Sequence, residues 1–189
     1  MQKYELRLSG SGGQGLILAG IMLGEAASIY DGKEATQSQS YGPEARGGAS
    51  RSEVIISDKP IDFPKVRNAD FMLSMTQESY DKYIPGLKED GILLTDSFFV
   101  TKIKPRAGKV YSMELTKIAI EKGGKKIVAN VVSLGAIVAL TNVVSMEAMK
   151  KAVLERAPKG TEDMNLKALE EGYKAAIELK EKTLQGALK

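Results

Sequence analysis

A glycine-rich turn between two apolar segments constrains the fold of this chain more than any other feature. Residues 3–8 alternate apolar and charged side chains, the period of a β-strand with one buried face. Gly10, Gly12 and Gly15 follow with G-x-G-x-x-G spacing, and residues 16–30 then have the composition of an apolar helix. A strand, a glycine turn and a helix in this order open an α/β domain.

The rest of the chain continues the alternation of strands and helices. Further strands are expected at residues 33–39, 49–57, 71–75, 91–96 and 100–113, and helices at 77–84, 131–144, 146–156 and from 163 onward. The segment between the first two of these strands is too short and glycine-rich for a crossover helix, which favours a hairpin-like excursion. No repeat or linker divides residues 1–189. We therefore predict one α/β domain, a Rossmann-like open sheet with a glycine-rich first turn and C-terminal helices.

Two absences restrict the chemistry of the chain. The 189 residues include no Cys and no His. Without Cys the chain has no thiolate nucleophile and cannot ligate an iron–sulfur cluster. Without His it lacks the commonest general base at neutral pH and the commonest transition-metal ligand. Three kinds of function remain possible for the chain: chemistry by carboxylate, Lys or Tyr side chains, chemistry by a cofactor supplied from elsewhere, and binding.

The charge and hydropathy patterns argue against membrane and nucleic-acid partners. Residues 127–146 carry no charge over a length that could span a bilayer, but amide and hydroxyl side chains interrupt the segment. The mean hydropathy of −0.17 agrees with a buried helix. The net charge of +3 is too small to indicate nucleic-acid binding, and residues 1–7 include no apolar run of a signal peptide. We expect a cytoplasmic protein, and the dominance of Lys and Glu among its charges hints at a thermophilic source.

The glycine turn is the first candidate site. Its main-chain N–H groups, together with a helix N-terminus, can approach an anion because glycine leaves room for the ligand. The candidate ligand-binding residues are Gly10, Ser11, Gly12, Gly13, Gln14 and Gly15. A tight structural turn explains the same pattern equally well. A nicotinamide site is disfavoured because no second helix fits between residues 33 and 57.

A second loop and two weaker features complete the candidates. The loop combines a rigid Gly-Pro with an Arg among small residues, which suits a guanidinium that meets a carboxylate or phosphate; its residues are Tyr41, Gly42, Pro43, Glu44, Arg46, Gly47 and Gly48. An exposed loop with Arg46 paired to Glu44 or Glu53 is the alternative. Asn130 could cap the uncharged helix or lie at the edge of a site. The basic excess over residues 102–126 could face an acidic partner, phosphates or only solvent.

The two loops together resemble a known family. Residues 10–15, Gly-Ser-Gly-Gly-Gln-Gly, and residues 37–48, which include Ser-Tyr-Gly-Pro-Glu-Ala-Arg-Gly-Gly, resemble the gamma subunit of 2-oxoacid:ferredoxin oxidoreductases, above all its 2-oxoglutarate branch. The similarity extends over most of the chain, through residues 50–56, 130–136 and 165–168. The pairing of these two loops is far more specific than either glycine run alone.

The resemblance implies a role inside an assembly. In such a complex a 2-oxoacid reacts with coenzyme A to give acyl-CoA and CO2 while ferredoxin is reduced. Thiamine diphosphate and Mg2+ belong to the alpha and beta subunits, and 4Fe-4S clusters to the beta or delta chains of the heterotetramer. By the resemblance, this chain binds no cofactor or metal, has no catalytic residue and is inactive alone. It contributes to the coenzyme A region and to subunit assembly, with residues 10–15 facing an anion and residues 41–48 facing a partner subunit or ligand.

Three alternatives stay open at this point. The chain could be the gamma subunit of an enzyme for pyruvate, 2-oxoisovalerate or indolepyruvate. It could instead be a freestanding dinucleotide-binding protein, or a scaffold whose glycine loops only form interface turns. Isolated from its partners, it could pair with a second copy through its exposed partner face.

Overall fold

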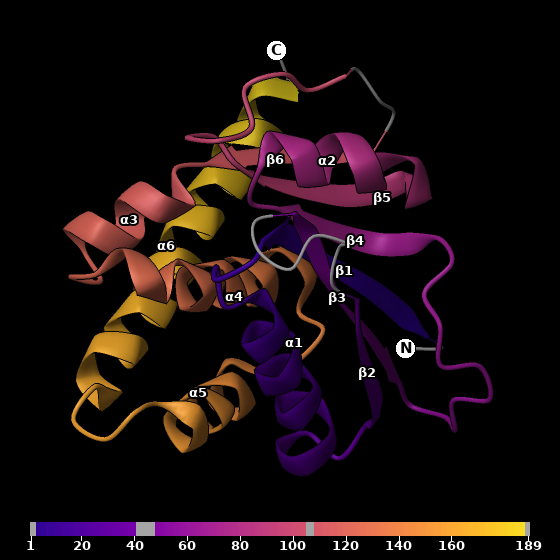
Figure 1. The fold of residues 1–189 in the computed structure, drawn as a ribbon, viewed down its shortest axis with the longest axis horizontal. Helices are drawn as coiled ribbons and strands as arrows, with labels where there is room; N and C mark the ends of the chain where they lie inside the picture. The colour runs from indigo at the N-terminus through magenta and orange to yellow at the C-terminus, as the bar shows by residue number, and fades with distance from the viewer. Residues whose placement is uncertain (1–2, 41–47, 105–107, 188–189) are drawn as a thin grey trace.

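The fold is one six-stranded sheet with most of its helices on one face (Figure 1). The computed structural model describes residues 3–40, 48–104 and 108–187. The strands are β1 (Tyr4–Ser11), β2 (Glu34–Ser40), β3 (Ala49–Ser57), β4 (Ala69–Ser74), β5 (Leu87–Asp96) and β6 (Lys109–Met113), in the spatial order β2-β3-β1-β4-β5-β6. The α/β class predicted from the sequence is confirmed.

The sheet is mixed, with a parallel half and an antiparallel half. β1, β4, β5 and β6 pair in parallel, while β3 runs antiparallel to both β1 and β2. The pairing of β2 with β3 confirms the hairpin-like excursion. β3 therefore lies between β1 and β2, so the strand that follows α1 is not a neighbour of β1. In a dinucleotide-binding fold, those two strands are adjacent and parallel.

The helices are α1 (Leu16–Glu25), α2 (Gln77–Tyr83), α3 (Leu115–Glu121), α4 (Ala129–Thr141), α5 (Met146–Arg156) and α6 (Glu162–Ala187), with a π-helical turn η1 (Ala26–Tyr30) and 3-10 turns η2 (Ile84–Gly86) and η3 (Lys126–Val128). The helices α1, α4, α5 and α6 pack on one face of the sheet, named here the four-helix face, and form the larger apolar core. A smaller apolar cluster lies on the opposite face, named the α2 face.

Close backbone contact between α4 and α6 fixes the four-helix face. A Cβ placed on Gly135 would lie 2.0 Å from the carbonyl oxygen of Leu169, and one placed on Gly172 would lie 2.0 Å from that of Val132. Only glycine lets the two helices approach so closely at these points. α4 is buried along nearly its whole length, so its uncharged sequence is that of a helix in the protein core. None of the helices in the described part of the chain is long and apolar enough to cross a bilayer.

The α2 face contains a buried ion pair. The Arg7 Nε donates to Glu53 Oε1 at 2.8 Å, and its terminal nitrogens donate to the carbonyl oxygens of Val66 and Gly86, each at 3.3 Å. Both charged side chains are more than nine-tenths buried. Glu53 therefore has a buried partner in Arg7, and the guanidinium of Arg51 lies 5.3 Å from the centre of the Tyr83 ring on the same face.

One predicted strand was too long. Of the strand expected over residues 100–113, only β6 forms within the described residues, and Gln77 Oε1 accepts the N–H groups of Thr101 and Lys102, which binds that backbone to α2. The helix expected over residues 16–30 has those bounds in the structure, where α1 continues into the π-helical turn η1. The short helix α3 was not predicted, since its seven residues lie within a segment whose charges suggested a solvated face.

Candidate functional site

The candidate site lies where the parallel strands end. The turn at residues 12–15 follows β1, and a cavity of about 300 Å3 opens beside it. Its lining comes from the turn, the end of β4, the start of α3, and the η3–α4 junction, and consists of Gly13, Gln14, Met75, Thr116, Lys126, Ile127 and Ala129. The carboxyl ends of parallel strands are the usual position of ligand sites in open α/β sheets.

The turn is shaped by two left-handed glycines and a side-chain brace. Gly13 has φ +87° and Gly15 has φ +72°, values that L side chains rarely adopt. The Gln14 side chain folds back so that its Oε1 accepts the N–H of Ser11 at 2.8 Å. This hydrogen bond braces the turn from within. Beyond it, Leu16 begins α1 with Gly15 as its N-cap and no side-chain cap.

Gly10 and Ser11 belong to the strand, not to the turn. They pair with Ser50 and Ala49 of β3. A Cβ on Gly10 would lie 2.2 Å from Gln14 Oε1 and 3.0 Å from Met75 Cβ, so this glycine makes room for the brace. Of the six predicted ligand residues, only Gly13 and Gln14 line the cavity.

Asn130 lies against the glycine turn. Its Nδ2 donates to the carbonyl oxygen of Gly15 at 3.2 Å, across 115 residues of sequence. A Cβ on Gly15 would lie 2.6 Å from that Nδ2, so the contact requires glycine there. The N-cap of α4 is Val128, and the prediction of Asn130 as the helix cap was therefore wrong. The alternative prediction, that Asn130 lies at the edge of a binding site, stays a prediction.

Sequence reasoning missed the polar pair under the cavity. Asp96, at the end of β5, is fully buried, and its Oδ2 accepts the hydroxyl of Thr116 at 2.5 Å and the N–H of Thr116 at 3.1 Å. Burial raises the pKa of Asp96, and these hydrogen bonds oppose the rise only in part. An Asp that directly follows an apolar strand was the available signal. The pair ties the start of α3 to the sheet edge.

The second predicted loop lies mostly outside the described residues. Tyr41, Gly42, Pro43, Glu44, Arg46 and Gly47 fall within residues 41–47, which the structure leaves undescribed. Gly48 is described and buried, and it precedes Ala49, the partner of Ser11 in the sheet. β2 ends at Ser40 and β3 begins at Ala49, both at the edge of the sheet that carries the glycine turn.

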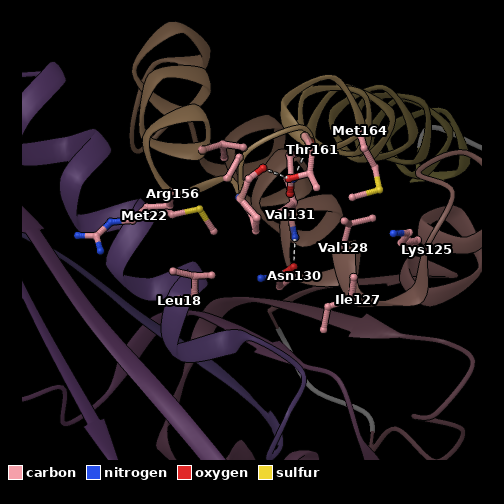
Figure 2. A pocket seen from close by; sticks show the side chains of 14 residues that line it. Leu18, Met22, Lys125, Ile127, Val128, Asn130, Val131, Arg156, Thr161 and Met164 are labelled. Carbon is pink, nitrogen blue, oxygen red and sulfur yellow. Dashed lines mark hydrogen bonds between the residues drawn. The ribbon is translucent and has the colours of Figure 1, made fainter.

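A second cavity of about 210 Å3 adjoins the first (Figure 2). Met22 from α1 and Met164 from α6 extend toward it from opposite sides, while the Arg156 guanidinium points away and pairs with Glu25. Asn130 and Ile127 border it as well. The segments around residues 130 and 165, both part of the family resemblance, thus meet at one cavity.

The described residues offer no site for a metal ion. Across residues 3–40, 48–104 and 108–187, no group of three or more acidic side chains is placed to bind one.

Comparison with known proteins identifies the class to which this fold and site belong. The family model for pyruvate ferredoxin/flavodoxin oxidoreductase matches residues 5–175. The chain belongs to this family. A solved structure of a keto/oxoacid ferredoxin oxidoreductase gamma subunit from Geobacter sulfurreducens superposes with a TM-score of 0.88 at 53% identity, covering 95% of this chain and 99% of that one.

Within the family the chain is a gamma-type subunit of the 2-oxoglutarate branch. It is 55% identical, over 94% of its length and 96% of the relative's, to the 2-oxoglutarate synthase subunit KorC of Methanocaldococcus jannaschii. It is 33% identical to the ketoisovalerate oxidoreductase subunit VorA of Methanothermobacter thermautotrophicus, where the match covers 93% of this chain but 37% of that longer chain. The same unit therefore also exists as part of a larger polypeptide.

Proposed function

We propose that this chain is the gamma subunit of a 2-oxoglutarate:ferredoxin oxidoreductase. The observation that carries the proposal is the 55% identity to a 2-oxoglutarate synthase subunit over nearly the whole of both chains. In this role it assembles with alpha, beta and delta subunits in the cytoplasm. The complex converts 2-oxoglutarate, coenzyme A and oxidised ferredoxin to succinyl-CoA, CO2 and reduced ferredoxin.

The chain's own part in this reaction is to bind and position, not to react. Because it has no Cys, it ligates no iron–sulfur cluster, and the 4Fe-4S clusters, thiamine diphosphate and Mg2+ of the complex belong to the other subunits. The redox and carbanion chemistry is then supplied by those cofactors.

The cavity beside the glycine turn is proposed to receive a phosphate group of coenzyme A. Lys126 supplies an ammonium at the cavity wall, and the first turn of the ten-residue helix α1 directs main-chain N–H groups to the same edge. A cavity of about 300 Å3 is at the lower limit for a small-molecule site, so it accepts part of the ligand and leaves the rest to the partner subunits.

The test is anaerobic reconstitution with the alpha, beta and delta chains. The native chain should restore 2-oxoglutarate- and coenzyme A-dependent reduction of ferredoxin, and its failure to do so would refute the proposed function. Lys126→Gln should raise the KM for coenzyme A by roughly tenfold with little change in kcat, because it removes a binding charge and no reacting group. Lys59→Gln, on an exposed residue beyond β3, is the matched control and should leave the KM unchanged.

Backbone geometry provides a second arm of the same test. Gly13 and Gly32 both have positive φ, and a Cβ on either would meet nothing within 4 Å. Gly13→Ala and Gly32→Ala therefore impose a similar strain of about 1–2 kcal/mol at opposite ends of the sheet. Only Gly13→Ala should raise the KM for coenzyme A. Equal kinetics of the two variants would remove the glycine turn from the site.

A further inference from the structure

The smaller cavity adjoins the proposed coenzyme A site and shares Ile127 with it, but its other lining residues differ. Its walls are mostly aliphatic and thioether side chains from three helices, α1, α5 and α6, and from the η3–α4 junction. Its volume of about 210 Å3 is below the roughly 300–1,000 Å3 of typical small-molecule pockets. Space of this size suits one large apolar side chain.

The surface around the mouth is also apolar. Leu18 is 38% exposed and Ile127 is 60% exposed, and both line the cavity. A small ligand that filled the cavity would leave these two side chains in water, whereas a protein surface would cover them. The thioethers of Met22 and Met164 inside the cavity can adapt to the shape of an inserted side chain.

Two basic side chains, Lys125 and Arg156, line the cavity. Within the described part of the chain, no carboxylate lies within 4 Å of the Lys125 ammonium. Arg156 differs from Lys125, because Glu25 already neutralises it. The complementary surface is therefore apolar at its centre and acidic at its rim.

We infer that this cavity is a docking socket for a catalytic subunit of the oxidoreductase, which inserts an apolar side chain flanked by carboxylates. This inference rests on the proposed function. A second polypeptide segment is favoured over a second copy of this chain because the VorA relative contains the same unit as 37% of a longer chain. In such a chain the remaining polypeptide is available to cover this unit. The inserted side chain would be the anchor of the interface.

The test measures the affinity of the full chain for the reconstituted alpha, beta and delta subunits. Leu18→Ser should weaken this affinity by about thirtyfold, the effect of removing an interface anchor contact. Leu154→Ser is the matched control, because Leu154 is also a helical leucine with 38% exposure but does not line the cavity. It should leave the affinity within about twofold of the native value.

A charge reversal tests the acidic rim independently. Lys125→Glu should weaken association by about tenfold and reduce its dependence on salt, since it places like charges together. Lys59→Glu, at the opposite end of the sheet, should change neither the affinity nor its dependence on salt. Thermal unfolding of each variant shows whether the fold is retained, which is expected because the four side chains are partly or fully exposed.

The outcomes separate this inference from the proposed function. If the native chain does not associate with the other subunits, the proposed function fails. If the native chain associates and restores activity while Leu18→Ser binds equally well, only the docking socket is refuted. Should Leu18→Ser dissociate a homodimer of the isolated chain without weakening the complex, the occupant is a second copy and the inference is overturned.

Discussion

The two faces of the sheet are stabilised by different physical means. On the four-helix face, a large apolar core is sealed by α4 and α6, whose backbones touch at Gly135 and Gly172. On the α2 face, a seven-residue helix covers a smaller cluster, and the buried pair Arg7–Glu53 occupies the remaining space. The stability of the four-helix face depends on close packing, whereas that of the α2 face depends on pairing its buried charges.

This difference shows where a functional surface can form. Close-packed helices tolerate little change along their contact. Both cavities described above lie beside the N-terminus of α4, and neither is lined by the residues of the Gly135 and Gly172 contacts. The rigid contact of α4 with α6 thus positions Asn130 against the glycine turn.

The largest effect is expected where the backbones touch. Gly135→Ala should lower the free energy of unfolding by about 4 kcal/mol or more, because the added Cβ would overlap the Leu169 carbonyl oxygen. Gly24→Ala on α1 is the control: its Cβ would only reach Gln37 at 4.0 Å, and it should be neutral or stabilising by up to about 1 kcal/mol. Chemical denaturation of both variants checks this, and equal stabilities would contradict a backbone contact at Gly135.

The next largest effect is expected on the α2 face. Glu53→Ala should cost about 3 kcal/mol of unfolding free energy, since it leaves the Arg7 guanidinium buried without its carboxylate. The double variant Arg7→Met with Glu53→Leu should recover most of this loss, because no uncompensated charge remains. Unfolding free energies of the native chain, the single variants and the double variant measure the loss and its recovery. If the loss came only from the cavity left by Glu53, the double variant would not be more stable than Glu53→Ala.

A smaller effect is expected at the contact between the helical layer and the turn. Asn130→Ala should cost about 1 kcal/mol, because it removes one of the two donors to the Gly15 carbonyl oxygen and leaves only the N–H of Ala19. Amide hydrogen exchange over residues 12–18 should quicken by roughly tenfold. Asn165→Ala, on a similarly buried amide that bonds only Thr161, should leave exchange in the turn unchanged. The same exchange rates in both variants would disprove a bracing role for Asn130.

The smallest effect concerns pH. Burial raises the pKa of Asp96 in the folded chain above the unfolded value of about 3.9. The stability contributed by the protonated carboxyl is then fully present below that unfolded value and is lost as pH rises through the folded pKa. Asp96→Asn cannot ionise, so its stability relative to the native chain should improve as pH rises above about 4. Unfolding curves over a pH series test this, and a constant difference would show that the pKa is not raised.

Local patterns predicted the elements, but their ends depended on distant partners. The glycine turn and the buried α4 were readable because positive φ and an uncharged run leave distinct marks in a sequence. The late start of β6 within the expected strand was not readable, because the backbone at Thr101 and Lys102 is held by the Gln77 side chain of α2. The contact of Asn130 with the glycine turn was not predicted for the same reason, since its acceptor lies 115 residues away.

The sequence by itself determined the α/β class, the glycine turn, the lack of thiol and imidazole chemistry, and the family. Each of these follows from residue types and short spacings, which the chain carries before it folds. Only the tertiary structure decided that β3 lies between β1 and β2, that Asp96 and Thr116 meet, and that two cavities flank η3. Those features depend on long-range packing, in which the position of each residue is set by neighbours that are remote in the sequence.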